Sequence, residues 1–270
     1  MPPRLQLEVV SREEFAPAQP GLYQAFPTVT RSGPDRLLVA FRQGRVDDDW
    51  EREAGDHGGS GDVYVADSLD GGQSFGPPRL VVDHRWQGTN ELDGLVTGLN
   101  DQETLLITRA HGPEIFGSFW ALSQDQGQTF GPRQPLDLAA LALDSGQSQP
   151  LACFGHVLPD QEEGGLLVSF YTYASYGDQK VGLARLKMDE FSFELVSWIW
   201  EGQLRGCFLN ETAVVRLADG RLLAMCREEP CLSGLCFSWL TAGCWSSSGG
   251  WARTWARTTT SASPHPRTTA

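Results

Sequence analysis

One pattern of apolar and polar positions recurs four times along the chain. In each instance an apolar strand leads into a polar turn, and a pair of leucines then opens a second apolar strand. The leucine pairs begin at Leu37, Leu105, Leu166 and Leu222, which are 68, 61 and 56 residues apart. Each turn contains Gly, Pro, Asn or Asp, which favour tight reversals. The pattern predicts four β-hairpins, each in a segment long enough for a four-stranded sheet.

A second repeat follows two of these hairpins. Ser68–Phe75 and Ser123–Phe130 both read S-x-D-x-G-x-[ST]-F, and each precedes Gly-Pro. We expect Asp70 and Asp125 to accept hydrogen bonds from backbone amides inside the turn, the glycine to permit the reversal and the phenylalanine to anchor it. We interpret both aspartates as structural, since a turn that uses their oxygens leaves little for catalysis or calcium.

Repeated four-stranded sheets, with no sustained helical period, predict an all-β chain folded as a β-propeller, in which circular packing protects the sheet edges. Four blades are visible, all within residues 1–230. Residues 231–270 differ in composition: they hold none of the 34 acidic residues but four of the nine tryptophans. We interpret them as a non-native tail from a frameshifted gene, with a disordered tail or a small Cys-rich appendage as alternatives.

The charge of the chain narrows the classes of partner. The formal net charge is −13, so nucleic acid and anionic membranes are not expected partners. The apolar runs are strand-sized, and the charged N-terminus does not resemble a signal peptide, which predicts a cytoplasmic protein. The six cysteines form no CxxC pair, so we expect no disulfide, no metal site and no cofactor.

The two S-x-D-x-G-x-[ST]-F segments are Asp-boxes by their sequence, and together with the hairpin pattern they resemble the sialidase (neuraminidase) superfamily over about residues 20–230. The resemblance implies about four of the six blades of a sialidase-type propeller. It also implies a glycoside hydrolase, an exo-sialidase or a relative, acting on terminal acidic sugars. A non-catalytic glycan-binding or scaffold propeller is the alternative, and an unrelated function is a third.

The resemblance assigns roles to residues near the first hairpin. Arg45 matches an arginine beside the substrate carboxylate, and Asp56 matches the catalytic acid/base on a loop. Arg42 competes with Arg45 for the first role, and either arginine alternatively caps a strand end. Four other aspartates align nearly as well as Asp56, namely Asp47, Asp48, Asp49 and Asp62.

Later segments supply the other matches. Tyr171 and Tyr173 match pocket tyrosines, although packing between blades explains them equally well. Glu211 matches the base that activates the nucleophile, and Arg227 matches a carboxylate-binding arginine. Sialidases use a tyrosine nucleophile because a carboxylate would be repelled by the acidic sugar, and a phenol with a pKa near ~10 needs such a base.

The sequence also departs from the family pattern. Ala25 stands where the family has its first carboxylate-binding arginine, and no tyrosine follows Glu211 to act as the nucleophile. Loss of one charge-assisted pair costs on the order of 1.5–3 kcal/mol of binding. We therefore expect the chain to be weakly active or inactive as a sialidase.

Overall fold

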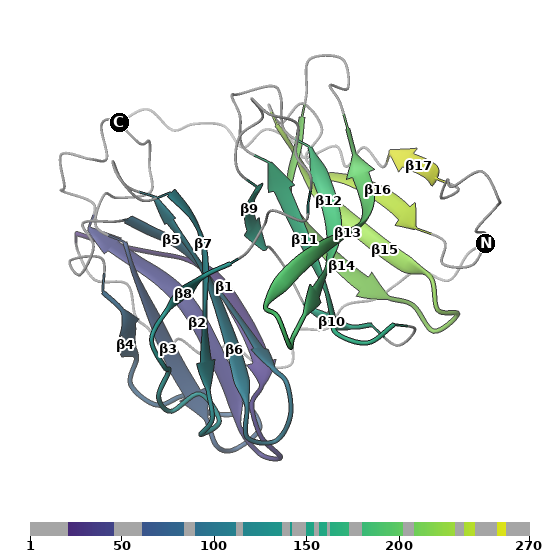
Figure 1. Ribbon diagram of the computed structural model, residues 1–270. Helices are drawn as coiled ribbons and strands as arrows, with labels where there is room; N and C mark the ends of the chain where they lie inside the picture. Colours follow the sequence, from purple (N-terminus) through teal and green to yellow (C-terminus); the bar gives the residue numbers. More distant parts are fainter. Residues whose placement is uncertain are drawn as a thin grey trace.

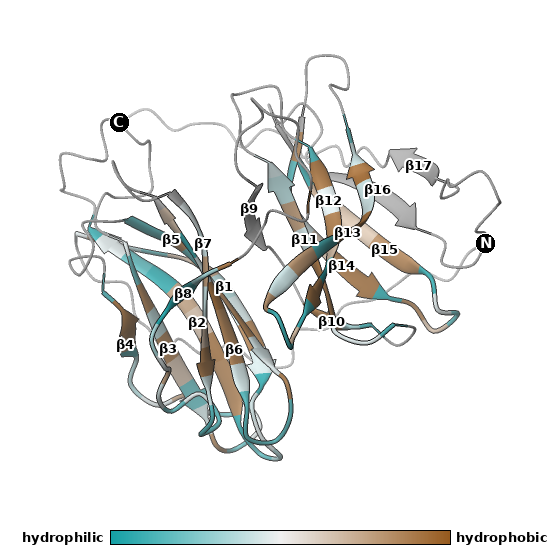
Figure 2. Ribbon diagram, in the orientation of Figure 1, coloured by the Kyte–Doolittle hydropathy of each residue, from teal (hydrophilic) through white to brown (hydrophobic). Residues whose placement is uncertain are grey.

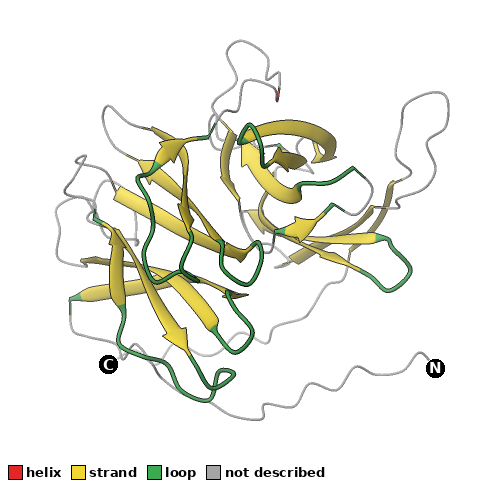
Figure 3. Cartoon of the chain, turned by 60° about the horizontal axis from the view of Figure 1, so that its bottom comes forward, coloured by secondary structure: helices red, strands yellow, loops and turns green. Residues whose placement is uncertain are grey.

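The computed structural model describes residues 21–45, 61–83, 90–111, 116–136, 141, 150–153, 157–160, 163–172, 180–201, 208–229, 235–240 and 253–257. Within these residues the chain forms β-strands and no α-helix (Figure 1, Figure 3). The strands make four antiparallel sheets that follow one another in chain order. The predicted all-β propeller with four blades is confirmed.

Blades 1 and 2 have the same simple meander. Blade 1 consists of β1 (Leu22–Arg31), β2 (Leu37–Arg45), β3 (Asp62–Ser68) and β4 (Arg79–Val82). Blade 2 consists of β5 (Asn90–Gly98), β6 (Thr104–His111), β7 (Phe116–Ser123) and β8 (Gln134–Pro135). The predicted hairpins are therefore the first two strands of each blade.

Blades 3 and 4 vary this plan. In blade 3 the first strand is split into β9 (Pro150–Cys153) and β10 (Leu158–Pro159), which both pair with β11 (Leu166–Thr172), followed by β12 (Val181–Lys187) and β13 (Ser192–Trp200). Blade 4 consists of β14 (Phe208–Arg216), β15 (Leu222–Glu229), β16 (Leu235–Leu240) and β17 (Arg253–Arg257). Its two outer strands fall in residues 231–270. That this segment is a non-native tail from a frameshifted gene stays a prediction.

The apolar residues are concentrated in the middle of the strands (Figure 2), and they form one core at each junction between blades. Leu38 and Val63 of blade 1 pack with Val96 and Leu106 of blade 2. A second cluster joins blades 2 and 3, and a third joins blades 3 and 4. Stability therefore depends on blade-to-blade packing, and the four sheets make an open series instead of a closed ring.

The two repeated turns have the same hydrogen bonds. The Asp70 carboxylate accepts from the Ser74 amide at 2.9 Å and from the Ser74 hydroxyl at 2.6 Å, and Asp125 accepts from Thr129 at 2.8 and 2.6 Å. These are the turn hydrogen bonds that the sequence predicts. They hold the pKa of Asp70 below its usual value, and they lower that of Asp125 to about 2 although partial burial acts to raise it.

Candidate functional site

The second strand of each blade carries one chemically distinctive side chain four or five residues after the first leucine of its pair. Arg42, Tyr171 and Arg227 each stand five residues after the first leucine of their pair, and Arg109 ends the corresponding apolar stretch of β6. Across the hairpins, Arg42 is paired with Ala25, Arg109 with Asp93 and Arg227 with Asn210. The hairpin repeat therefore brings charged residues of different blades to one level of the propeller.

The first strands carry a bulge at this same level. The register shifts between Ala25 and Thr28 in β1, between Glu91 and Asp93 in β5, and between Asn210 and Ala213 in β14. Extra residues of this kind redirect side chains and are frequent next to active sites.

Two of the bulges hold a non-glycine residue in the left-handed region. Phe26 has φ +55° and Glu211 has φ +34°. Such a conformation is costly for a residue with a Cβ, and it persists where the surrounding structure imposes it, frequently at functional sites. The conformation of Glu211 is thus the first structural indication that this end of blade 4 has a function.

Buried polar interactions at this level join strands of blade 2 to each other and to blade 3. Asp93 Oδ2 lies 2.8 Å from Arg109 Nε, and both side chains are about nine-tenths buried. Arg109 Nη1 also donates a hydrogen bond to the Tyr171 hydroxyl. Glu211 of blade 4 acts electrostatically on both Arg109 and Tyr171. We call Asp93, Arg109, Tyr171, Glu211 and Arg227 the central cluster.

The environment fixes the ionisation states of this cluster. Burial acts to lower the pKa of Arg109, but Asp93, Tyr171 and Glu211 together outweigh it and hold that pKa above its usual value. Burial raises the pKa of Tyr171 to about 12, against the opposing influence of Arg109. Tyr171 is therefore a neutral hydroxyl at physiological pH, and Arg109 is charged.

Glu211 and Arg227 form the accessible part of the cluster. Arg227 Nη1 lies 2.7 Å from Glu211 Oε1, and their side chains are 42% and 25% exposed. A carboxylate beside a guanidinium, both within reach of solvent, provides a hydrogen-bond acceptor and a bidentate donor. This pair can therefore contact a polar ligand directly.

Arg42, in contrast, joins blade 1 to blade 2. Its Nε donates to the Glu91 carbonyl at 2.9 Å and its Nη2 to Asn90 Oδ1 at 3.0 Å. A Cβ on Gly61 would lie 2.6 Å from Arg42 Nε, so the guanidinium is tightly enclosed. Burial lowers the pKa of Arg42 to about 10. We interpret Arg42 as a structural cross-link, since it is fully buried.

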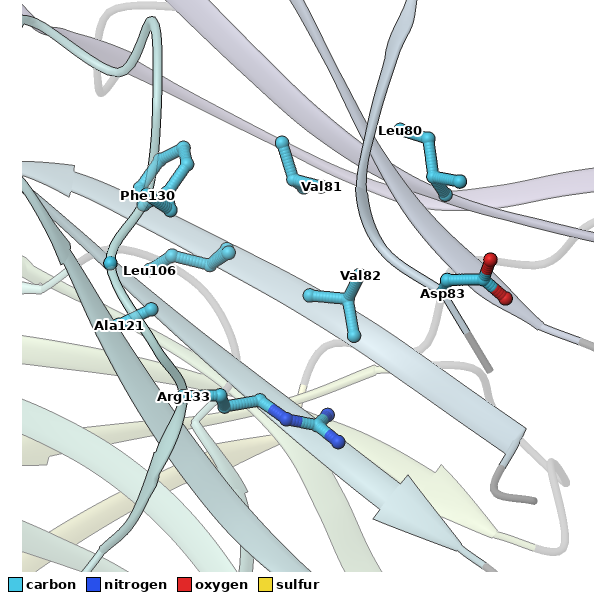
Figure 4. Close-up of a pocket in the computed structure, with 9 residues that line it drawn as sticks. Leu80, Val81, Val82, Asp83, Leu106, Ala121, Phe130 and Arg133 are labelled. Atoms are coloured by element: carbon cyan, nitrogen blue, oxygen red, sulfur yellow. The ribbon is translucent and has the colours of Figure 1, made fainter. Parts of the chain in front are cut away.

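A neighbouring buried pair borders an apolar crevice between blades 1 and 2. Arg133 Nη1 lies 2.6 Å from Glu91 Oε1, with almost no exposure of either side chain. Arg133 and Asp83 are the charged residues that line the crevice, whose volume is about 390 Å³ and whose walls include Val82 and Leu106 (Figure 4). Its walls are mainly aliphatic, so we place the candidate site at the central cluster, where polar groups converge.

The structure brings three of the sequence-predicted residues together: Tyr171, Glu211 and Arg227. Arg45 is the exposed last residue of β2. Asp56 and Tyr173 lie outside the described residues, as do three of the aspartates that compete with Asp56. The fourth, Asp62, begins β3. The roles of Arg45, Asp56 and Tyr173 stay predictions.

Sequence reasoning missed Asp93 and Arg109. Arg109 ends the second instance of the hairpin pattern just as Arg42 ends the first and Arg227 the last, so comparing the repeats could have found it. The signal for Asp93 was weaker, because its pairing with Arg109 depends on a bulge in β5. Among the described residues, no group of His, Cys, Asp and Glu is arranged to hold a metal ion, and no helix is long and apolar enough to cross a membrane.

No model of a known protein family matches this sequence, and no curated protein is similar to it in sequence. Solved structures do match its fold. A Dyadobacter fermentans protein of unknown function is 17% identical with a TM-score of 0.64, over 88% of this chain and 70% of that one. Hadza microbial sialidase Hz136 is 14% identical with a TM-score of 0.64, over 86% of this chain and 46% of that one.

A thermostable family-43 glycoside hydrolase is 11% identical with a TM-score of 0.54, over 90% of this chain and 75% of that one. At these identities the likeness concerns the fold alone. The chain has the propeller fold found in sialidases and in family-43 glycoside hydrolases, and it spans less than half the length of the sialidase Hz136.

Proposed function

We propose that the chain is a sialidase-like glycoside hydrolase unit whose central cluster binds a terminal acidic sugar. The observation that carries this proposal is the Glu211–Arg227 pair, in which a strained glutamate is held 2.7 Å from an accessible arginine. The buried Arg109 and the neutral Tyr171 hydroxyl lie beside it. The fold shared with sialidase Hz136 supports the same class of ligand.

In this proposal each group has a chemical role. Arg227 binds the sugar carboxylate by charge-assisted hydrogen bonds. Glu211 is the base for a nucleophile, and Asp56 protonates the leaving oxygen. Arg45 and Tyr173 complete the substrate contacts that the sequence suggests. Tyr171 is not the nucleophile, because it is 6% exposed and its pKa lies at about 12.

A non-catalytic glycan-binding propeller is the second candidate. Ala25 is the hairpin partner of Arg42, so the first blade contributes no arginine from that position. The five tyrosines all precede Glu211 in the sequence. A chain with these features retains groups that recognise a sugar but lacks a nucleophile for Glu211 to activate.

Hydrolysis of an aryl sialoside distinguishes the two candidates. The purified chain is compared with its Glu211→Gln variant and with protein from a gene whose reading frame is corrected after codon 230. We expect turnover only from the frame-corrected protein. The purified chain and the frame-corrected protein should both bind the sugar. Comparable turnover by the purified chain and the frame-corrected protein would require a nucleophile within residues 1–230, which the two proteins share. If either of them fails to bind an acidic sugar, the proposed function is wrong.

A further inference from the structure

The hairpins of blades 2 and 4 give their arginines different partners. In blade 2 the first-strand residue opposite the arginine is Asp93, and it binds that arginine, Arg109, at 2.8 Å. In blade 4 the residue opposite Arg227 is Asn210, which precedes the bulge of β14, whereas Asp93 follows the bulge of β5. Arg227 binds Glu211 instead, at 2.7 Å. Arg227 therefore binds the glutamate next to its hairpin partner.

Within the described residues, no donor reaches the buried side-chain oxygen of Asn210. The residue is 5% exposed, and its Oδ1 accepts no hydrogen bond from the part of the chain that the structure describes. Asn90, at the start of β5, provides the contrast, because its Oδ1 accepts from the Gly61 amide at 2.9 Å and from Arg42 at 3.0 Å. Buried polar atoms in folded proteins nearly always have a partner.

The position of Asn210 indicates where that partner comes from. It directly precedes Glu211 in β14 and faces Arg227 across the hairpin. Glu211 and Arg227 are both reached by solvent, so a ligand bound to them lies close to the Asn210 amide. We propose that Asn210 is a ligand-recognition residue, whose Oδ1 accepts a hydrogen bond from a hydroxyl or amide N–H of the sugar held by Glu211 and Arg227.

This inference rests on the proposed function, and it adds a requirement on the ligand. The sugar must present a donor next to the group that binds Arg227. A buried acceptor of this kind discriminates strongly, because a ligand without the donor leaves the acceptor unpaired. The site would therefore bind a polyhydroxylated or N-acylated acidic sugar and reject a simple carboxylic acid.

The test separates a ligand role from a structural one. Asn210→Leu keeps the approximate size of the side chain and removes the buried oxygen, so its melting temperature should equal or exceed that of the wild type. Asn90→Leu is the matched control, and it should melt at a lower temperature because it removes two hydrogen bonds. Affinity is measured by calorimetric titration with the methyl α-glycoside of N-acetylneuraminic acid, and Asn210→Leu should weaken it about tenfold.

Two results would overturn the assignment of Asn210 alone. One is a fall in melting temperature as large as that of Asn90→Leu, which would show that Asn210 has a structural partner. The other is an unchanged melting temperature with unchanged affinity. If the wild-type chain itself does not bind the glycoside, the proposed function fails together with this role, and the melting temperatures still report whether the oxygen is satisfied within the protein.

Discussion

The buried pair of Asp93 and Arg109 allows the sharpest test of how the central cluster is built. Replacing Arg109 by Met removes the guanidinium 2.8 Å from Asp93 and the donor to Tyr171. Asp93 is then a carboxylate at 6% exposure that has lost this cation. Removing one member of a buried ion pair costs about 3–5 kcal/mol, a large part of the roughly 5–15 kcal/mol that stabilises a typical domain.

The double variant Arg109→Met/Asp93→Leu should recover most of this loss. Replacing both charges by apolar groups of similar volume is often neutral or stabilising, so we expect a stability within about 1 kcal/mol of the wild type. The double variant should nevertheless bind the sialoside weakly, because the charges that support Tyr171 and Glu211 are gone. Compared with Arg109→Met, the double variant would then recover stability without recovering sialoside binding.

Urea unfolding followed by tryptophan fluorescence measures these differences. The surface pair of Lys187 and Glu194, 3.1 Å apart with both side chains nearly half exposed, is the control, and Lys187→Met should cost at most about 1 kcal/mol. Equal instability of the single and double variants would refute the reasoning, and so would a cost for Arg109→Met no larger than that of the control.

Three further predictions concern the repeated turns. Asp70→Ala and Asp125→Ala should each lower the melting temperature and leave the affinity for the sialoside unchanged; wild-type stability with lost binding would contradict their structural role. Both carboxylates have a pKa below the value of about 3.9 in an unfolded chain. Their ionised forms therefore stabilise the fold fully above about pH 4, and this contribution is lost as the pH falls toward about 2. Melting temperatures between pH 5 and pH 3 should fall less steeply for the alanine variants than for the wild type. Gly127→Ala, at φ +79°, places a Cβ 2.4 Å from a leucine of β2, whereas the Cβ of Gly71→Ala, at φ +72°, meets no atom within 4 Å. We expect Gly127→Ala to be the more destabilising of the two by about 1–3 kcal/mol in urea unfolding. Equal effects of the two variants would contradict the packing of this turn on blade 1.

The fold could be predicted from the sequence because its determinants are local. The leucine pairs mark the start of each second strand to within one residue: β2, β11 and β15 begin at Leu37, Leu166 and Leu222, and β6 begins one residue before Leu105. Turn residues fix where each hairpin reverses, and a period of two along each strand separates its two faces. Repetition of the pattern then identifies the blade.

The site was less predictable because its geometry depends on deviations from the repeat. Glu211 was found from the resemblance, but its positive φ follows from a bulge that no pattern of hydrophobic residues reveals. Arg42 and Arg109 end the same sequence pattern, yet Arg42 is enclosed at the junction of two blades while Arg109 reaches Tyr171. The two arginines are not at equivalent positions, because Arg42 stands five residues after Leu37 and is paired with Ala25 before a bulge, whereas Arg109 stands four residues after Leu105 and is paired with Asp93 after a bulge.

A crystal structure of the chain with the methyl α-glycoside of N-acetylneuraminic acid tests the central claim most directly. We predict that the sugar lies against Glu211 and Arg227, with its carboxylate on Arg227 and a hydroxyl or amide N–H on Asn210, and that Arg109 still joins Asp93 to Tyr171. A sugar bound only elsewhere, for example in the crevice beside Arg133, or a crystal soaked at saturating concentration with no sugar at the central cluster, would contradict the account.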